Sequence, residues 1–241
     1  MSPSTPSNRP SDAPTLADLP DPQAILFDLD GTLVDTVDLR IEAWSRAFAG
    51  IGLTVDRDHL AEYMGSDGRW LAGELARELG RELDYAATDE LDRASGSVFD
   101  ELNARPVPLP GATELLTALE GSRLVFAIAT SSQPGQVAAS VEALRLPAPP
   151  PITDGSHVAH AKPEPDLLLA SAAQLGIAPE CCWYVGDSSW DMMASVRAKM
   201  VAIGATTGAA DAAGLLAAGA AVAVGSLTQL LGELRRRGLV R

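Results

Sequence analysis

A short apolar run that ends in two aspartates constrains the fold of this chain more than any other segment. The run reads Ile25-Leu26-Phe27-Asp28-Leu29-Asp30-Gly31-Thr32. Residues 24–27 have the length and character of a buried strand, and the carboxylates follow at its C-terminal end. In open α/β sheets ligands bind at that edge, where a carboxylate can attack a phosphoryl group or hold a cation. The same residues also fit a strand with an ordinary Asp-Gly turn, so the rest of the chain has to decide.

Helix and strand patterns alternate after residue 107, which predicts a parallel sheet with helices on both faces. We expect strands at 124–130, near 152, and at 182–186, 201–204 and 221–224. We expect helices at 112–119, 135–144, 165–175, 190–198, 209–217 and 227–236. Together with the first strand, this pattern predicts an α/β fold with a Rossmann-like parallel sheet core.

The segment between the first strand and this alternation carries only helical patterns. Its apolar residues recur at steps of three and four, first at Val37, Ile41, Trp44 and Phe48, and again within 71–79 and 88–103. An insertion of this size reads as a second domain. We therefore expect a helical cap at 37–106, a core formed by 21–36 and 107–241, and a disordered tail at 1–20, which has no periodicity.

Composition narrows the possible partners of the chain. Its 241 residues carry a formal net charge of −14, which argues against nucleic acid and anionic membranes. A phosphorylated substrate stays possible, because a local cation or metal ion can reverse the field at one site. We find no apolar stretch of transmembrane length and no signal-peptide pattern, so we expect a cytoplasmic protein, monomeric or weakly dimeric. Of 18 basic residues only Lys162 and Lys199 are lysines, which suggests a specific reason for keeping Lys162.

Polar residues follow strands, or occupy a loop, at four places that should share one edge of the sheet. These residues are Asp28 and Asp30, then Thr130, Ser131 and Ser132, then Lys162, and finally Asp187 and Asp191. Each group alone fits an ordinary turn or helix cap. Turn statistics do not readily produce all four groups in this order.

The ordered set resembles the haloacid dehalogenase (HAD) superfamily, in its phosphatase branch, which includes phosphoglycolate phosphatases and β-phosphoglucomutases. The matching motifs cover 28–32, 127–131, 162–163 and 186–191, and the inserted helices resemble the C1 cap of that family. The resemblance implies a Mg²⁺ ion held by Asp28, the main-chain carbonyl of Asp30, and Asp187. It also implies that Asp28 attacks phosphorus to form an aspartyl-phosphate, while Asp30 serves as general acid and base.

The remaining roles follow from the same resemblance. Thr130 and Ser131 would bind phosphoryl oxygens, and Lys162 would supply a fixed positive charge between nucleophile and phosphate. Asp191 would orient Lys162 or a metal-bound water. The residues themselves, and not the resemblance, point to the glycine-flanked cap loop at 62–70 as the specificity loop, with Arg69 contacting the leaving group. The loop could equally be a plain turn with Trp70 in the cap core.

The expected function is Mg²⁺-dependent hydrolysis of a small phosphorylated metabolite. Phosphoglycolate, sugar phosphates and polyol phosphates are all candidates, and the sequence does not rank them. A hexose-phosphate mutase of the same superfamily is the alternative, although Arg40 stands where those mutases carry a histidine, and arginine does not shuttle protons near neutral pH. A non-catalytic binding module is a third possibility, which the completeness of the four motifs disfavours.

Overall fold

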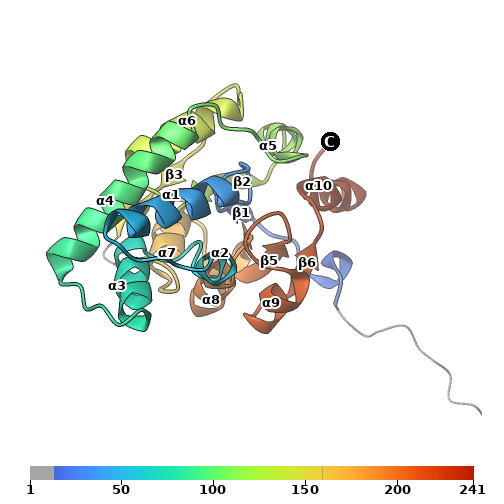
Figure 1. Cartoon of the computed structure of the whole chain (residues 1–241). Coiled ribbons are helices and arrows are strands. Elements are labelled where there is room, and N and C mark those ends of the chain that lie inside the picture. The colour runs from blue at the N-terminus through green and yellow to red at the C-terminus, as the bar shows by residue number, and fades with distance from the viewer. Residues whose placement is uncertain (1–13, 159) are drawn as a thin grey trace, which may run out of the picture.

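The structure is a computed structural model that describes residues 14–158 and 160–241. These residues form one six-stranded sheet, parallel throughout, with the strand order β3-β2-β1-β4-β5-β6 (Figure 1). The strands are β1 (Ala24–Phe27), β2 (Val125–Ala129), β3 (Ile152–Thr153), β4 (Cys182–Gly186), β5 (Val201–Ala205) and β6 (Val222–Val224). The predicted α/β class and the parallel sheet are confirmed.

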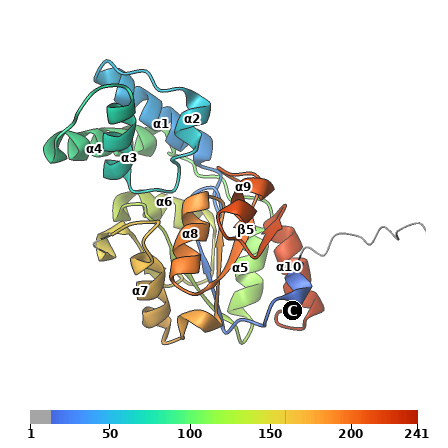
Figure 2. The ribbon, with the colours of Figure 1, turned by 90° about the horizontal axis from the view of Figure 1, so that it is seen from below.

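Helices cover both faces of the sheet, because each central strand is apolar on both sides (Figure 2). In β1, Ile25 and Phe27 belong to one core cluster, while Ala24 and Leu26 belong to another. The first cluster is closed by α5 (Ala112–Glu120), α6 (Pro134–Ala143) and α10 (Leu227–Arg236). The opposite face packs against α7 (Asp166–Leu175), α8 (Ser189–Arg197) and α9 (Ala212–Ala217).

The inserted helices have a hydrophobic core of their own, built around Trp44, Phe48, Leu71 and Leu75. They are α1 (Val37–Gly50), α2 (Arg57–Ala61), α3 (Gly68–Glu78) and α4 (Tyr85–Leu102). Asp56, Asp67 and Asp84 cap α2, α3 and α4, respectively, by accepting hydrogen bonds from first-turn amides. Figure 2 shows these helices as a separate body above one edge of the sheet. We propose that they form the cap at 37–106, over a core of 21–36 and 107–241.

One helix boundary differs from the pattern-based prediction for a local reason. Helix α9 begins at Ala212 and not near 209, because Asp211 caps it by accepting a hydrogen bond from Gly214 N (2.7 Å). The residues before the cap form a loop, in which Ala210 N donates to the Asp187 carbonyl (3.0 Å). This loop returns to the carboxyl edge of the sheet, so its path is set by that edge and not by helical periodicity.

Part of the expected disordered tail is packed on the core. Residues 1–13 lie outside the described residues, but Leu16–Asp18 form a 3-10 turn in which Leu16 is buried. The Trp183 indole donates to the Pro20 carbonyl (3.0 Å), and Arg237 Nη1 donates to the Leu19 carbonyl (2.9 Å). The prediction of disorder is therefore wrong for residues 16–20, where one leucine and two backbone acceptors suffice to anchor a polar segment.

Within the described part of the chain, no helix combines the length and the apolar character that crossing a membrane requires.

The packing of Leu16 predicts a measurable contribution to stability. Leu16→Ala should lower the free energy of unfolding by about 2 kcal/mol, since the site lies at the periphery of the core, where large-to-small changes cost least. Urea titration followed by circular dichroism would measure the change. Leu216→Ala is the matched control, because Leu216 is 48% exposed. Equal effects of the two substitutions would show that the N-terminal segment adds nothing to stability.

Candidate active site

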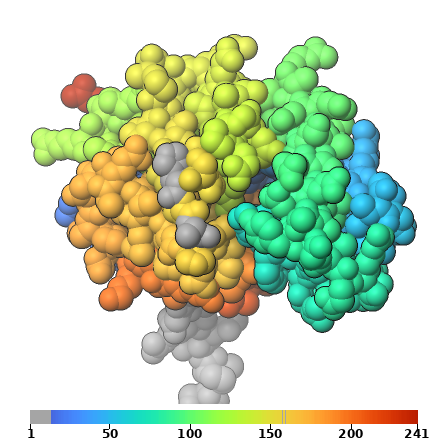
Figure 3. All heavy atoms as spheres, turned by 90° about the vertical axis from the view of Figure 1, so that its left-hand side faces the viewer, coloured from blue at the N-terminus to red at the C-terminus, as the bar shows by residue number. Residues whose placement is uncertain are grey.

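A cleft of about 740 Å³ lies between the cap and the carboxyl edge of the sheet. Figure 3 shows it as the hollow between the green and teal cap and the yellow part of the core. The predicted site residues that line it are Asp28, Asp30, Arg69, Thr130, Ser131, Lys162 and Asp187. The strand ends therefore bring four distant segments of the sequence to one place, as the parallel topology requires.

The buried ammonium of Lys162 joins two of these segments. Lys162 Nζ donates to Asp28 Oδ1 (2.6 Å) and to Asp191 Oδ1 (2.7 Å), and the side chains of all three residues are at most 7% exposed. Tyr184 Oη also donates to Asp191 Oδ1 (3.1 Å). The nearby carboxylates hold the pKa of Lys162 well above its usual value in spite of burial. Lys162 is therefore a fixed positive charge beside Asp28.

Asp191 has both oxygens occupied by protein groups. Its Oδ2 accepts from Ser188 N (3.0 Å) and Ser188 Oγ (2.6 Å), in a capping box that starts α8. The same side chain thus begins a helix and positions Lys162.

The carboxylate of Asp187 is held just as closely by hydrogen bonds. Thr32 Oγ1 donates to Asp187 Oδ1 (2.9 Å), and Ala209 N donates to Oδ2 (2.8 Å). A Cβ atom at either Gly31 or Gly208 would overlap the Asp187 carboxyl group. Backbone without side chains therefore encloses this carboxylate, and Gly31 adopts φ +76°, which suits glycine.

The residues around Asp28 fit a hard divalent cation. Asp28, Asp187 and Asp191 each offer an oxygen within 4.8 Å of the others. Burial, and then the crowding of these carboxylates, raise the pKa of Asp28 well above its usual value despite Lys162, and raise the pKa of Asp187 to about 7. Among the described residues no donor contacts Asp28 Oδ2. An all-oxygen cluster with excess negative charge is the donor set that Mg²⁺ prefers.

Asp30 faces a different set of partners. Its carboxylate accepts from Thr36 Oγ1 (2.7 Å), Ser132 Oγ (2.5 Å) and Arg40 Nη2 (3.0 Å). Burial alone would raise the pKa of Asp30, but Arg40 and the two hydroxyls outweigh it, and the pKa lies below its usual value. The environments of these two neighbouring carboxylates thus shift their pKa values in opposite directions, upward for Asp28 and downward for Asp30.

Arg40 connects the cap to the core directly over Asp30. Besides Asp30, its guanidinium donates to Ser132 Oγ (2.6 Å) and to Gln136 Oε1 (3.0 Å) of α6, and it stacks on the Phe99 ring at 3.5 Å. The Arg40 guanidinium is therefore held by three hydrogen-bond acceptors and one aromatic ring.

The end of β2 supplies neutral hydrogen-bonding groups to the cleft. Thr130 is buried, and its hydroxyl accepts from Ser132 N (3.2 Å). The Ser131 hydroxyl is buried without a hydrogen-bond partner in the part of the chain that the structure describes. A buried unpaired hydroxyl in the lining of the cleft has the chemistry of a ligand contact.

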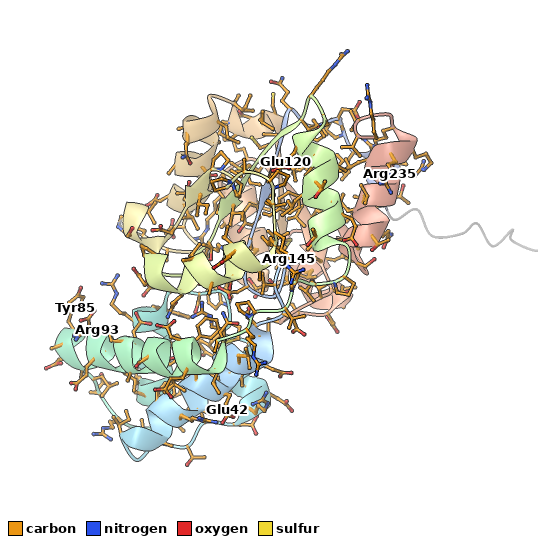
Figure 4. All side chains as sticks on the ribbon, turned by 90° about the horizontal axis from the view of Figure 1, so that it is seen from above. Glu42, Tyr85, Arg93, Glu120, Arg145 and Arg235 are labelled. Atoms are coloured by element: carbon orange, nitrogen blue, oxygen red, sulfur yellow. The ribbon has the colours of Figure 1, made fainter. Side chains whose placement is uncertain are left out.

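Arg69 lines the cap side of the cleft but already has a partner. Its Nη1 contacts Tyr85 Oη (2.9 Å), at the outer end of α4 in Figure 4. The alternative interpretation of Trp70 as a cap core residue is wrong, because its side chain is 45% exposed. Trp70 instead contacts Trp190, a residue of α8 in the α/β core, with the two ring centroids 5.0 Å apart.

Sequence reasoning missed two residues that support the site, Thr36 and Tyr184, and it assigned no supporting role to Thr32, Arg40 or Ser132. Thr32 lies within the first motif, and its position after the turn was an available signal. Tyr184 lies inside an apolar strand, where it reads as core, and nothing in the sequence points its hydroxyl toward Asp191.

A search against protein families identifies residues 25–205 as a haloacid dehalogenase-like hydrolase. The chain belongs to this family. It is 30% identical to hexitol phosphatase A of Escherichia coli strain K12 over 73% of the chain and 79% of that protein. It is 28% identical to β-phosphoglucomutase of Bacillus subtilis strain 168, over 77% of the chain and 84% of that enzyme. A hydrolase from Pseudomonas syringae superposes with a TM-score of 0.85 at 31% identity, covering 89% of this chain and 98% of that one. The resemblance seen in the motifs is thus confirmed.

The enclosure of Asp187 by glycine predicts a site-specific effect. Gly31→Ala should lower kcat/KM by about a hundredfold, because its Cβ would displace the Asp187 carboxylate, and small misplacements cost that much. Gly52→Ala is the matched control: Gly52 has φ +77°, and a Cβ added there would meet no atom within 4 Å, so this variant carries the backbone strain alone. Steady-state kinetics and thermal unfolding of both variants would separate the effects. Equal activity losses would point to strain as the cause.

Proposed function

We propose that this protein is a Mg²⁺-dependent phosphatase that hydrolyses a small phosphorylated metabolite through an aspartyl-phosphate intermediate. The observation that carries the proposal is the placement of Asp28, Lys162 and the unpaired Ser131 hydroxyl around one cleft. A carboxylate nucleophile, a buried cation and neutral donors are what transfer of a phosphoryl dianion needs. Membership in a family of hydrolases supports the same reaction class.

The phosphoryl group would bind between Lys162 and the end of β2. Lys162 Nζ lies 2.6 Å from Asp28 Oδ1, so its charge reaches both the nucleophile and the oxygens of a phosphate in front of it. Thr130 and Ser131 would donate hydrogen bonds to those oxygens. Asp191 acts through Lys162, whose position it fixes by a 2.7 Å contact.

Asp28 Oδ2 would attack phosphorus, with the ester oxygen leaving on the opposite side. Asp28, Asp187 and the Asp30 main-chain carbonyl would hold Mg²⁺, which when bound screens the charge of the phosphate and of the carboxylates. Asp28 must approach a dianion, and Lys162 alone does not balance the neighbouring carboxylates. The cluster of buried acids is therefore consistent with a metal-assisted site.

Asp30 would move protons. It would protonate the leaving alkoxide and later accept a proton from the water that hydrolyses the aspartyl-phosphate. Ser132 and Thr36 position its carboxylate, and Arg40 keeps it ionised while the cleft is empty. To act as an acid Asp30 must gain a proton, so the contact with Arg40 has to loosen when substrate binds.

The alternative function is that of a hexose-phosphate mutase, because one relative is named β-phosphoglucomutase. Arg40 favours hydrolysis, because a guanidinium that binds Asp30, Ser132 and Gln136 cannot pass protons to a sugar hydroxyl. Phosphate release from simple esters without a bisphosphate activator would distinguish the two reactions. Isomerisation of a hexose 1-phosphate with negligible phosphate release would favour the mutase.

Substitution of the nucleophile tests the proposed mechanism. Asp28→Asn should lower kcat by at least about a thousandfold, because an amide cannot form the phosphoenzyme. The fold should persist, since the amide oxygen can still accept from Lys162. Phosphate release and circular dichroism would measure both. Asp35→Asn is the control, because Asp35 is exposed outside the cleft. An Asp28→Asn enzyme with near wild-type turnover would exclude covalent catalysis by this residue.

Removal of metal provides an independent test. Treatment with EDTA should reduce phosphatase activity by at least about a hundredfold, and excess Mg²⁺ should restore it, because the anionic cluster repels substrate unless it is screened. Zn²⁺ should restore it poorly, since among the described residues no His or Cys side chain joins the carboxylate cluster at Asp28. Full activity after exhaustive chelation would contradict a metal-dependent site.

A further inference from the structure

The cap wall of the cleft carries three arginines, and each is already paired. Arg40 binds Asp30, Ser132 and Gln136. Arg93 forms an ion pair with Asp89 (2.6 Å), and Arg69 bonds to Tyr85 Oη (2.9 Å) with Asp67 3.8 Å away. Figure 4 shows Tyr85 and Arg93 together on the outer part of α4. An anionic leaving group would therefore have to break existing contacts to obtain a cation.

Asp92 lines the same wall but, unlike the three arginines, has no hydrogen-bond or ion-pair partner among the described residues. It lies on α4, is half-buried and lines the cleft. Among residues 14–158 and 160–241 no cation lies within ion-pair distance of its carboxylate, and no donor hydrogen-bonds to it. Burial, and next the charge of Asp67, raise the pKa of Asp92, although the charges of Arg69 and Arg40 act in the opposite direction. A partly desolvated carboxylate without a donor is stabilised by a ligand that brings one.

The surroundings of Asp92 indicate the kind of donor. Gly68 fits between the carboxylate and the Trp44 ring: a Cβ at Gly68 would overlap Asp92 Oδ1 and lie 3.2 Å from Trp44 Cζ2. Trp44 and Ser95 line the cleft on the same side. A carboxylate acceptor, a hydroxyl and an aromatic surface together match an alcohol that carries several hydroxyl groups on a carbon skeleton.

We propose that Asp92 reads the leaving group, and that the preferred substrates are phosphate esters of neutral, polyhydroxylated alcohols. This inference rests on the proposed phosphatase function and narrows its substrate class. A carboxylate accepts hydrogen bonds from neighbouring hydroxyls, and a site built to bind hydroxyls discriminates strongly against analogues that lack them. A leaving group with its own carboxylate or a second phosphate would face Asp92 with like charge. A cationic leaving group would have to compete for Asp92 with Arg69 and Arg40, whose charges already act on this carboxylate.

A panel of four esters tests the proposal: sorbitol 6-phosphate, phosphoglycolate, O-phosphoethanolamine and p-nitrophenyl phosphate, each assayed with Mg²⁺. The readout is kcat/KM for each ester divided by that for p-nitrophenyl phosphate, which carries neither hydroxyl nor carboxylate. The wild type should prefer sorbitol 6-phosphate to phosphoglycolate by at least about tenfold. Asp92→Asn should lower the relative value for sorbitol 6-phosphate by about tenfold, the scale of one charge-assisted hydrogen bond.

Two further variants separate recognition from general charge effects. Asp100→Asn removes the same charge from an exposed position of the same helix that also lines the cleft, and should change the ratios by less than about twofold. Asp92→Lys should raise the relative value for phosphoglycolate above that of the wild type, because the repulsion becomes an attraction. A loss of protein stability alone would lower kcat/KM for all four esters by the same factor and leave the ratios unchanged.

The outcomes distinguish this proposal from the proposed function. Turnover of the panel with equal ratios in wild type, Asp92→Asn and Asp100→Asn would overturn the role of Asp92 and leave the phosphatase intact. A wild-type preference for phosphoglycolate or O-phosphoethanolamine would also overturn it. Failure of the wild type to hydrolyse any ester, p-nitrophenyl phosphate included, would refute the phosphatase function and the substrate class with it.

Discussion

The site depends on one buried interaction, the ammonium of Lys162 between Asp28 and Asp191. Burying such charges costs free energy unless every partner is well placed, and here Tyr184 and Ser188 complete the hydrogen bonding of Asp191. The three parts come from the end of β1, from the loop before α7 and from the start of α8, so only the folded parallel sheet brings them together. Fold and chemistry are therefore fixed by the same contacts.

Much of this arrangement could be predicted from the sequence, because it follows from strand ends. Parallel strands place their carboxyl ends at one edge, so Asp28, Thr130 and Asp187 had to meet once the alternation was recognised. Contacts between the cap and the core could not be predicted in this way, because no pattern in the sequence indicates how the cap is oriented on the core. The bonds of Arg40 to Ser132 and Gln136 join residues over 90 positions apart in the sequence. The packing of Leu16 was hidden for another reason, since one leucine among polar residues has no periodicity.

The cap and the core divide the recognition of a substrate between them. The core side of the cleft presents Lys162 and hydroxyls to a group that is the same in every phosphate ester. The cap side presents three arginines that already have partners, and Asp92, which has no ion pair or hydrogen-bond donor among the described residues. In the proposed mechanism Asp30 moves protons, and Arg40, on α1, binds Asp30. A movement of α1 that admits a substrate would then also change the surroundings of Asp30, so the proposal couples substrate access to proton transfer through one side chain.

The scarcity of lysine has a practical consequence. The side chain of Lys162 is 1% exposed and contacts the carboxylates of Asp28 and Asp191. Lys199, in contrast, is exposed; it lies just after α8 and has φ 60°. Reagents that acylate amines attack the unprotonated, accessible form. Of the two lysines, the folded protein should therefore take such a reagent at Lys199, and a dye or surface linker could be attached there away from the cleft.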